Sequence, residues 1–378
     1  MQDRELMDLL QELEKIKDGE MSEAVSEMTE EFKRGHFPNV VYKIGELREQ
    51  YQLNDETENI LSLLSAVCYI QMKEYDKATA IIRTLFEKAE ADDADNLLFL
   101  SEMAFMCSVK LARRIATAAL KQMETSDFSD RFKLARCFLI LGESEEKMDK
   151  LPRSAKYYRK ALEHFHGGEE RDQHMILFLH FKLGMLYAAM NQVQDAVNFH
   201  LKVIEMSPEK EQENLRIHSL ISIGKIYGSR EADEKAVSYL KQALDEITET
   251  SLEETYTHAE ALTEMAFYYF DKGMLDEALP LYEHAIRIYA DSKQSENRKL
   301  GMIYMQYGYC LEHKKKSEIN RAAQTYDKAI AALEAANDPE LLENALADVI
   351  AFFDMHLPKQ KRKYENKLVE QSKKSQGF

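Results

Sequence analysis

The sequence predicts an all-α protein, built as a right-handed superhelical solenoid of helix hairpins. The chain has 378 residues but contains 13 glycines and 6 prolines, too few to supply the turns of a many-stranded sandwich or barrel. Alanine, leucine, glutamate, lysine and methionine, which favour helices, dominate in their place. Hydrophobic residues make up 45% of the chain, which excludes wholesale disorder. A recurring pattern of small and aromatic residues then favours stacked helix pairs.

The recurring pattern begins with a glycine or alanine, often followed by an aromatic residue three positions later. A second small residue stands twelve positions after the first in most copies. In the clearest copy these residues are Gly184, Tyr187 and Ala196, and the copy ends at Pro208. Successive copies begin at steps of 38 to 42 residues, at Ala66, Ala104, Gly142, Gly184, Gly224, Ala266 and Gly308. Such regular spacing predicts a repeat architecture.

The physical content of the pattern is a pair of helices joined by a tight turn, such as residues 189–192. Small residues let the two helices approach closely, and the aromatic rings fill the space beside them. A single pair cannot bury its apolar face, whereas stacked pairs share one continuous core. The repeats therefore predict a solenoid.

These residues resemble the tetratricopeptide repeat, which has Leu-Gly-x-x-Tyr in its first helix, Ala-x-x-x-Tyr/Phe-x-x-Ala in its second, and proline at the end. Residues 177–210, 217–250 and 259–292 match this pattern well, and the matching region covers about 59–336. The spacing exceeds the 34 residues typical of the family, which implies longer connections between units. The resemblance implies a fold but no single activity, because this scaffold serves many partners.

The regions that flank the repeats are predicted to be caps. Residues 1–55 are expected to form an acidic helical cap or bundle, with helices at 2–16, 20–34 and 38–52. Residues 56–337 are expected to form about seven tetratricopeptide-like units. Residues 338–378 are expected to form capping helices with a basic tail. Terminal units of a solenoid are expected to be atypical because one of their faces meets water.

Charge restricts the partners that the chain can bind. Its net charge of −17 opposes binding to nucleic acid and to anionic lipid. Residues 1–35 carry 11 acids and 5 bases, whereas residues 359–378 carry 7 bases and 2 acids. The basic tail is expected to pair with the acidic N-terminal helices, within or between chains, or to form a solvated face. No apolar run approaches the length of a membrane span, and no signal peptide opens the sequence, so we expect a cytoplasmic protein.

The sequence lacks the motifs that are typical of enzyme active sites, metal sites and cofactor sites. It contains no phosphate-binding glycine loop and no nucleophile elbow, so we expect no cofactor and no catalysis. His164, His166 and His174 cluster around a glycine-containing loop, which is too flexible a frame to favour a metal site. Isolated histidines are expected to pack in the core or at its rim, as at His200 and His284. The four cysteines are widely spaced in apolar helical stretches and are expected to be buried and reduced.

The resemblance implies that the concave groove is lined by fixed positions of each first helix. In the early and middle units these positions include Ile60, Leu63, Val67, Leu98, Ser101, Phe105, Arg136, Leu139 and Glu143. The early positions Ile60 and Val67 are too apolar to face water, so the acidic N-terminal helices or a partner would cover them. Leu63 and Val67 stand where chaperone-binding repeats carry lysine and asparagine, which argues against a chaperone clamp. Later positions mix apolar anchors with charges, a composition typical of peptide sites. The predicted groove residues are Phe181, Met185, Lys225, Glu260, Phe267, Phe270, Met305 and Tyr309.

The sequence therefore favours a non-catalytic adaptor or regulator that holds a protein or peptide in its groove. Its architecture and repeat spacing resemble the Rap-type peptide-sensing regulators of Gram-positive bacteria. That resemblance implies an N-terminal bundle that engages a response regulator and repeats that bind a signalling peptide. Two alternatives remain open: a Rap-like phosphatase or enzyme accessory, and a self-associating scaffold in which the basic tail meets an acidic N-terminus to form a homodimer. For each groove residue, packing between repeats is the competing explanation.

Overall fold

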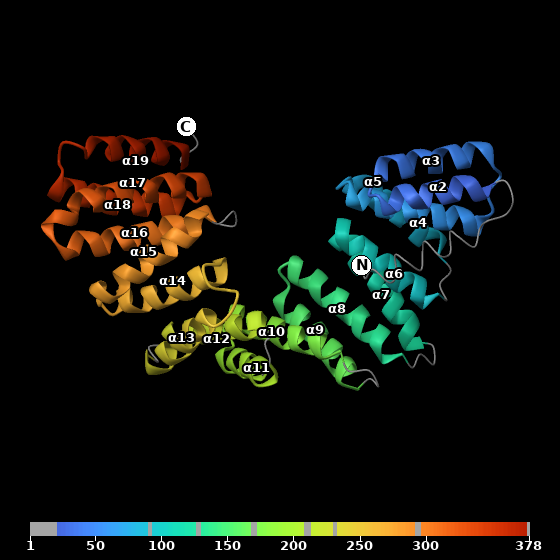
Figure 1. The fold of residues 1–378 in the computed structure, drawn as a ribbon, viewed down its shortest axis with the longest axis horizontal. Coiled ribbons are helices and arrows are strands. Elements are labelled where there is room, and N and C mark those ends of the chain that lie inside the picture. Colours follow the sequence, from blue (N-terminus) through green and yellow to red (C-terminus); the bar gives the residue numbers. More distant parts are fainter. Residues whose placement is uncertain are drawn as a thin grey trace. The chain divides into compact units, whose positions relative to one another are not determined.

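Helices account for every regular element in the part of the chain that the computed structural model describes (Figure 1). The described residues are 21–89, 93–125, 130–167, 172–207, 213–229, 233–291 and 296–375. They belong to two units, Met1–Gln192 and Val193–Phe378. The predicted helix at 2–16 and Pro208 lie outside the described residues. The predicted helices at 20–34 and 38–52 are present as α2 and α3.

In the first unit, paired helices follow one another along the chain. They are α2 Ser22–Lys33, α3 Phe37–Gln50, α4 Asp55–Gln71, α5 Tyr75–Lys88, α6 Ala94–Cys107, α7 Val109–Thr125, α8 Arg131–Lys147, α9 Leu151–Gly167 and α10 Gln173–Ala189. We call α4, α6, α8 and α10 the A helices of this unit, and α5, α7 and α9 its B helices. Helix α6 contacts both α4 and α8, and α5 contacts α7. The hairpins therefore stack with A helices in one layer and B helices in the other.

The second unit repeats the arrangement. Its helices are α11 Val193–Met206, α12 Glu213–Gly228, α13 Asp233–Thr248, α14 Tyr256–Asp271, α15 Leu275–Asp291, α16 Asn297–Lys314, α17 Ile319–Ala336, α18 Pro339–His356 and α19 Arg362–Ser375, with a short 3₁₀ turn at Lys316–Glu318. Here α12, α14 and α16 are the A helices, and α11, α13, α15 and α17 are the B helices. Helix α14 contacts both α12 and α16.

The small residues of the repeat do bring the paired helices together. A Cβ atom on Gly142 would lie 2.5 Å from the ring of Tyr158, and one on Gly224 would lie 2.6 Å from Leu240. The turn between hairpin helices is equally compact. In the predicted turn at 189–192, Asn191 has a φ of 59°, a conformation that asparagine tolerates better than most residues. The predicted helix–turn–helix unit is confirmed.

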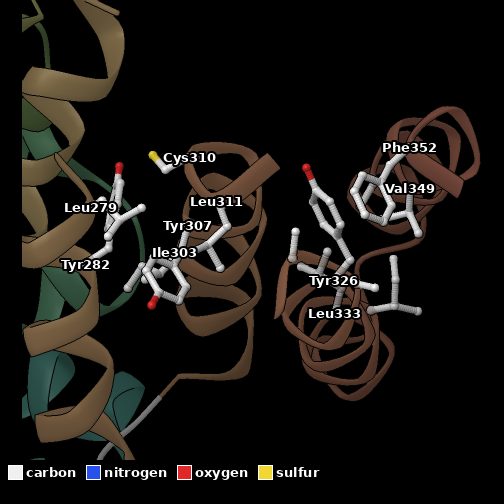
Figure 2. Close-up of a cluster of buried hydrophobic side chains, with 14 of the residues drawn as sticks. Leu279, Tyr282, Ile303, Tyr307, Cys310, Leu311, Tyr326, Leu333, Val349 and Phe352 are labelled. Carbon is white, nitrogen blue, oxygen red and sulfur yellow. The ribbon is translucent and has the colours of Figure 1, made fainter. Parts of the chain in front are cut away.

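Aromatic and aliphatic side chains fill the spaces between helices. Figure 2 shows Leu279 and Tyr282 of α15 beside Ile303 and Tyr307 of α16, all members of one buried cluster. The same cluster continues through Tyr326 of α17 to the C-terminal cap. Three of the cysteines are buried and the fourth is half-buried, and all four are free thiols: Cys68, Cys107, Cys137 and Cys310. Burial raises the pKa of Cys68 to about 12, which agrees with the predicted structural role.

The basic tail is anchored to its own chain. Tyr364 of α19 is buried, stacks on Phe353 at 4.5 Å between ring centroids, and donates a hydrogen bond to Asp327. Lys363 and Lys367 pair with acids of α17. These contacts hold the tail against acids of the second unit. The predicted pairing of the tail with the acidic helices of residues 1–35 stays a prediction.

We expect Gly142→Ala to lower the free energy of unfolding by about 1–3 kcal/mol, because its Cβ would overlap the Tyr158 ring. The ring cannot move aside easily, since it is buried and its hydroxyl donates to Glu146 at 2.6 Å. The matched control is Gly45→Ala in α3, where no atom lies within 4 Å of the added Cβ. That control should stabilise the helix by about 0.5–1 kcal/mol. Urea denaturation measures both effects, and equal stabilisation by the two changes would contradict the proposed close approach.

Candidate ligand groove

Six of the eight predicted groove residues lie on three neighbouring A helices of the second unit. They are Lys225 on α12, Glu260, Phe267 and Phe270 on α14, and Met305 and Tyr309 on α16. Because α14 contacts both other helices, these residues share one helical layer. The remaining two, Phe181 and Met185, lie on α10 of the first unit, where Phe181 is half-buried and Met185 is exposed.

Large apolar side chains are exposed on this layer. Phe267 is 47% exposed and Tyr309 is 42% exposed, and Met302 of α16 is exposed as well. Phe270 is half-buried and lies edge-on to Tyr309, at 5.5 Å between ring centroids. Met305 packs against the buried cluster. Packing between repeats therefore accounts for Phe270 and Met305, whereas Phe267, Met302 and Tyr309 present apolar surface to solvent.

The predicted groove charges already have partners. Nζ of Lys225 lies 2.9 Å from Glu264 of α14, and Nζ of Lys299 on α16 lies 2.6 Å from Glu260. Both pairs join adjacent A helices across a separation of 39 residues. Sequence reasoning missed Glu264 and Lys299. The sequence did carry a signal for both residues. Glu264 stands 39 residues after Lys225, and Lys299 stands 39 residues after Glu260, which is about one repeat length in each case.

The two ion pairs differ in what they leave available to a ligand. Burial opposes the charge on Lys299, but its hydrogen bond to Glu260 and the nearby Tyr289 outweigh burial and raise the pKa of Lys299. This half-buried pair therefore ties α14 to α16. The Lys225 side chain is 66% exposed, and an exposed pair contributes little stability. A ligand carboxylate can share the Lys225 ammonium with Glu264 at low cost.

The first unit contains a cavity in its A-helix layer. A cavity of about 190 Å³ is lined by Phe105, Arg136, Leu139 and Glu143, all of which were predicted from repeat positions to face the groove. Arg136 forms two hydrogen bonds to Glu102 of α6. Burial raises the pKa of Glu143, and it outweighs the opposing attraction of nearby lysines. The cavity thus combines apolar side chains with the carboxyl groups of Glu102, Glu143 and Asp172, and Glu143 is the one whose pKa burial raises.

The earliest predicted groove positions behave differently. Ile60, Val67, Leu98 and Ser101 are buried, which places them in the packing between helices rather than on an open apolar surface. Leu63 lines a cavity of about 600 Å³ between α4, α5 and α6. Packing between repeats, the competing explanation, therefore holds for those four positions. Of the acidic N-terminal helices that were expected to cover them, the helix at 2–16 lies outside the described residues, and coverage by the N-terminal helices stays a prediction.

One cluster of ionisable side chains was not predicted. Nε2 of His284 lies 2.7 Å from a carboxylate oxygen of Glu254, whose backbone N–H donates to Nδ1 of His258. One atom of each residue that could ligate a metal ion, a ring nitrogen or a carboxylate oxygen, lies within 4.8 Å of the other two. The bond to Nδ1 keeps the proton of neutral His258 on Nε2, so neither ring nitrogen offers a lone pair to a metal ion. The cluster instead fixes a turn in which Glu254 has a φ of 56°.

Two other histidines, His200 and His164, pack against neighbouring side chains. His200 is buried, lies 3.2 Å from the Ser219 hydroxyl, and has its pKa lowered to about 4 by burial. This confirms its predicted core position. His164 stacks on Phe138 at 5.5 Å between ring centroids, and His174 is exposed.

Comparison with known proteins supports the repeat assignment. Residues 258–291 match the sequence profile of the tetratricopeptide repeat, and no curated protein matches the sequence. Apo RapI is 17% identical, with a TM-score of 0.57 over 94% of this chain and 99% of its own. Aspartyl phosphate phosphatase F from Bacillus subtilis is 16% identical, with a TM-score of 0.53 over 94% of this chain and 95% of its own. The C-terminal part of a TPR repeat-containing protein from Cytophaga hutchinsonii is 16% identical, with a TM-score of 0.51 over 71% and 96% of the two chains.

The profile and the shared fold confirm the predicted all-α repeat solenoid. At these identities the solved structures bear on fold alone. Among the described residues, the helices lack the combination of length and apolar character needed to traverse a bilayer.

The raised pKa of Glu143 gives a pH-dependent test of its burial. Because its pKa is raised, Glu143 binds its proton more tightly in the folded chain than in the unfolded chain. Its contribution to the free energy of unfolding is therefore present at low pH and is lost as pH rises through the folded-state pKa. We expect Glu143→Gln to raise the thermal midpoint at pH 7. The gain should vanish below about pH 4, where the carboxyl is protonated in both states. Glu87→Gln on the exposed side of α5 is the control, and a gain from Glu143→Gln that does not change with pH would rule out this explanation.

Proposed function

We propose that this chain, a tetratricopeptide-repeat protein whose fold resembles that of Rap regulators, is a non-catalytic cytoplasmic adaptor or regulator. Its ligand is a peptide or an extended segment of a partner protein, held across α12, α14 and α16. The observation that carries the proposal is the exposure of Phe267, Met302 and Tyr309 on neighbouring A helices. Lys225, an exposed cation on the next A helix, supplies a polar contact.

The chemistry of this surface suits an extended ligand. Apolar anchors that lose solvent on binding supply most of the affinity, whereas a few charges set orientation. Phe267 and Tyr309 offer rigid aromatic area at a low cost in conformational entropy. A carboxylate of the ligand would approach Lys225 in place of Glu264. Phe270 and Met305 would support the anchors from below, and Glu260 would hold α14 against α16 through Lys299.

The described ionisable groups favour binding over catalysis. Cys137 and Cys310 are buried, and burial raises the pKa of each to about 12, which makes them poor nucleophiles. His200 is buried and kept neutral. We propose that ligand binding alters a partner protein rather than a bound substrate. Two structures named RapI and aspartyl phosphate phosphatase F share the fold over 94% of this chain, which supports a role in regulating a signalling protein.

The same proposal assigns roles to the rest of the chain. Residues 56–337 would form the ligand-binding repeats, and residues 1–55 would form a helical unit available to a second protein. Residues 338–378 would close the solenoid, a role supported by the burial of Tyr364 between α19 and its neighbours. Phe181 and Met185 of α10 would belong to a ligand-binding surface of the first unit itself.

Capture from lysate and from its small-peptide fraction, with quantitative mass spectrometry, tests the groove. We expect Phe267→Ala with Tyr309→Ala to reduce recovery of the ligand at least about tenfold, since each anchor is worth one or more kcal/mol. The control is Met355→Ala with Val369→Ala, which removes two exposed apolar side chains from the C-terminal cap. Lys225→Glu should reduce recovery further when combined with the anchor changes. If the ligand is retained by the variant with Phe267→Ala and Tyr309→Ala but lost from the variant with Met355→Ala and Val369→Ala, then it binds outside the groove.

A further inference from the structure

The B helices of the first unit carry an unusual charge. Helices α5, α7 and α9 contain 11 lysines and arginines but 4 acidic residues, whereas the whole chain has 50 bases and 67 acids. The A helices beside them, α4, α6 and α8, contain 4 bases and 8 acids. The first unit is thus basic on its B layer and acidic on its A layer.

This basicity is not a general property of solvated B helices. Helices α11, α13 and α15 occupy the same place in their repeats in the second unit, and they contain 4 bases and 10 acids. Two sets of helices with the same structural role therefore carry opposite charge. A solvent-facing role alone favours neither sign, so the basic layer calls for a separate explanation.

Most cations of this layer have no anion beside them among the residues that the structure describes. Among the described residues, Arg113 pairs with the buried Glu145 of α8, and Lys77 pairs with Glu74. Arg114 and Lys160 lie over aromatic rings. The others are exposed, and no described acidic side chain lies within ion-pair distance of them: Arg83, Lys88, Lys110, Lys121, Arg153, Lys156 and Arg159. Unneutralised like charges on one layer raise the free energy of the unbound protein and favour an anionic partner.

One end of the layer is also concave. Lys156, Arg159 and Lys160 of α9 line a cavity of about 510 Å³, whose lining also includes Glu163 of α9, Tyr187 of α10 and Met190 directly after α10. A partner segment seated there would meet three cations, one acid and two large, mainly apolar side chains. This combination fits acidic residues interspersed with apolar ones.

We propose that the basic layer of α5, α7 and α9 docks an acidic segment of a partner protein. The site is separate from the groove on α12, α14 and α16, and the proposal does not depend on ligand binding in that groove.

A protein segment fits better than nucleic acid for two reasons. The net charge of −17 repels an extended polyanion at long range. Each of the three helices also carries at least one acid, for example Glu124 of α7 and Glu163 of α9, which a uniform phosphate backbone would meet unfavourably.

Fluorescence anisotropy with the full chain and a labelled (Glu-Glu-Leu-Ala)₄ peptide tests the proposal. The test variant combines Lys121→Glu, Lys156→Glu and Arg159→Glu, all exposed positions. The control combines Lys241→Glu, Arg287→Glu and Lys328→Glu, which are exposed on B helices of the second unit and change the net charge equally. We expect the test variant to weaken binding at least about tenfold and the control by less than about twofold. Binding should also fall steeply with added salt.

A second set of measurements separates this proposal from its alternatives. Neutralisation of the same three residues to glutamine should weaken binding in the same direction but by less. The matched (Gln-Gln-Leu-Ala)₄ peptide should not bind. Equal losses in the test and control variants would overturn the proposal in favour of net charge alone. Absence of binding to the wild-type chain would also overturn it, as would tighter binding of duplex DNA through the same three residues.

Discussion

Close contact between a small residue on an A helix and a large side chain, a tyrosine ring or a leucine, on the paired B helix is the constraint on which the structure depends. In the hairpin of α8 and α9, the Tyr158 ring covers Gly142 and its hydroxyl donates to Glu146, one turn further along α8. In the hairpin of α16 and α17, Tyr326 covers Gly308 and donates to Glu312 in the same way. The ring sets the distance between helices, and the hydroxyl sets their register. Stacking of such pairs then follows from the apolar faces that each leaves open.

This constraint decides which residues are left for function. A and B helices bury the faces that meet, so adjacent repeats must be joined by side chains at the edges of these faces. Ion pairs do this at about one repeat of separation, as in Lys225 with Glu264 and Arg136 with Glu102. Charged residues on the A layer are therefore largely committed to joining repeats. The chemistry left for a ligand in the second unit is chiefly apolar, from Phe267 and Tyr309.

The fold was predictable because its signal is steric and local. Glycine or alanine at a fixed distance from an aromatic residue can be seen in one hairpin at a time, and seven copies reinforce it. The groove was only partly predictable because exposure depends on neighbouring repeats. Ile60 and Val67 occupy the same repeat positions as solvent-facing residues elsewhere, yet both are buried. The bond between Glu254 and His284 could not be predicted, since it needs a left-handed turn that no residue preference favours at a glutamate.

The two proposed surfaces would therefore select partners by different physics. On the A layer, where charges already bridge helices, discrimination between ligands must come mainly from the shape and apolar area around Phe267 and Tyr309. On the B layer of the first unit, cations such as Lys121 and Lys156 bridge no described helices, so their field extends to solvent and speeds the encounter with an acidic partner. Shape selection acts chiefly on dissociation, whereas charge acts on association and responds to salt. One chain with both surfaces could hold two partners whose affinities are tuned independently.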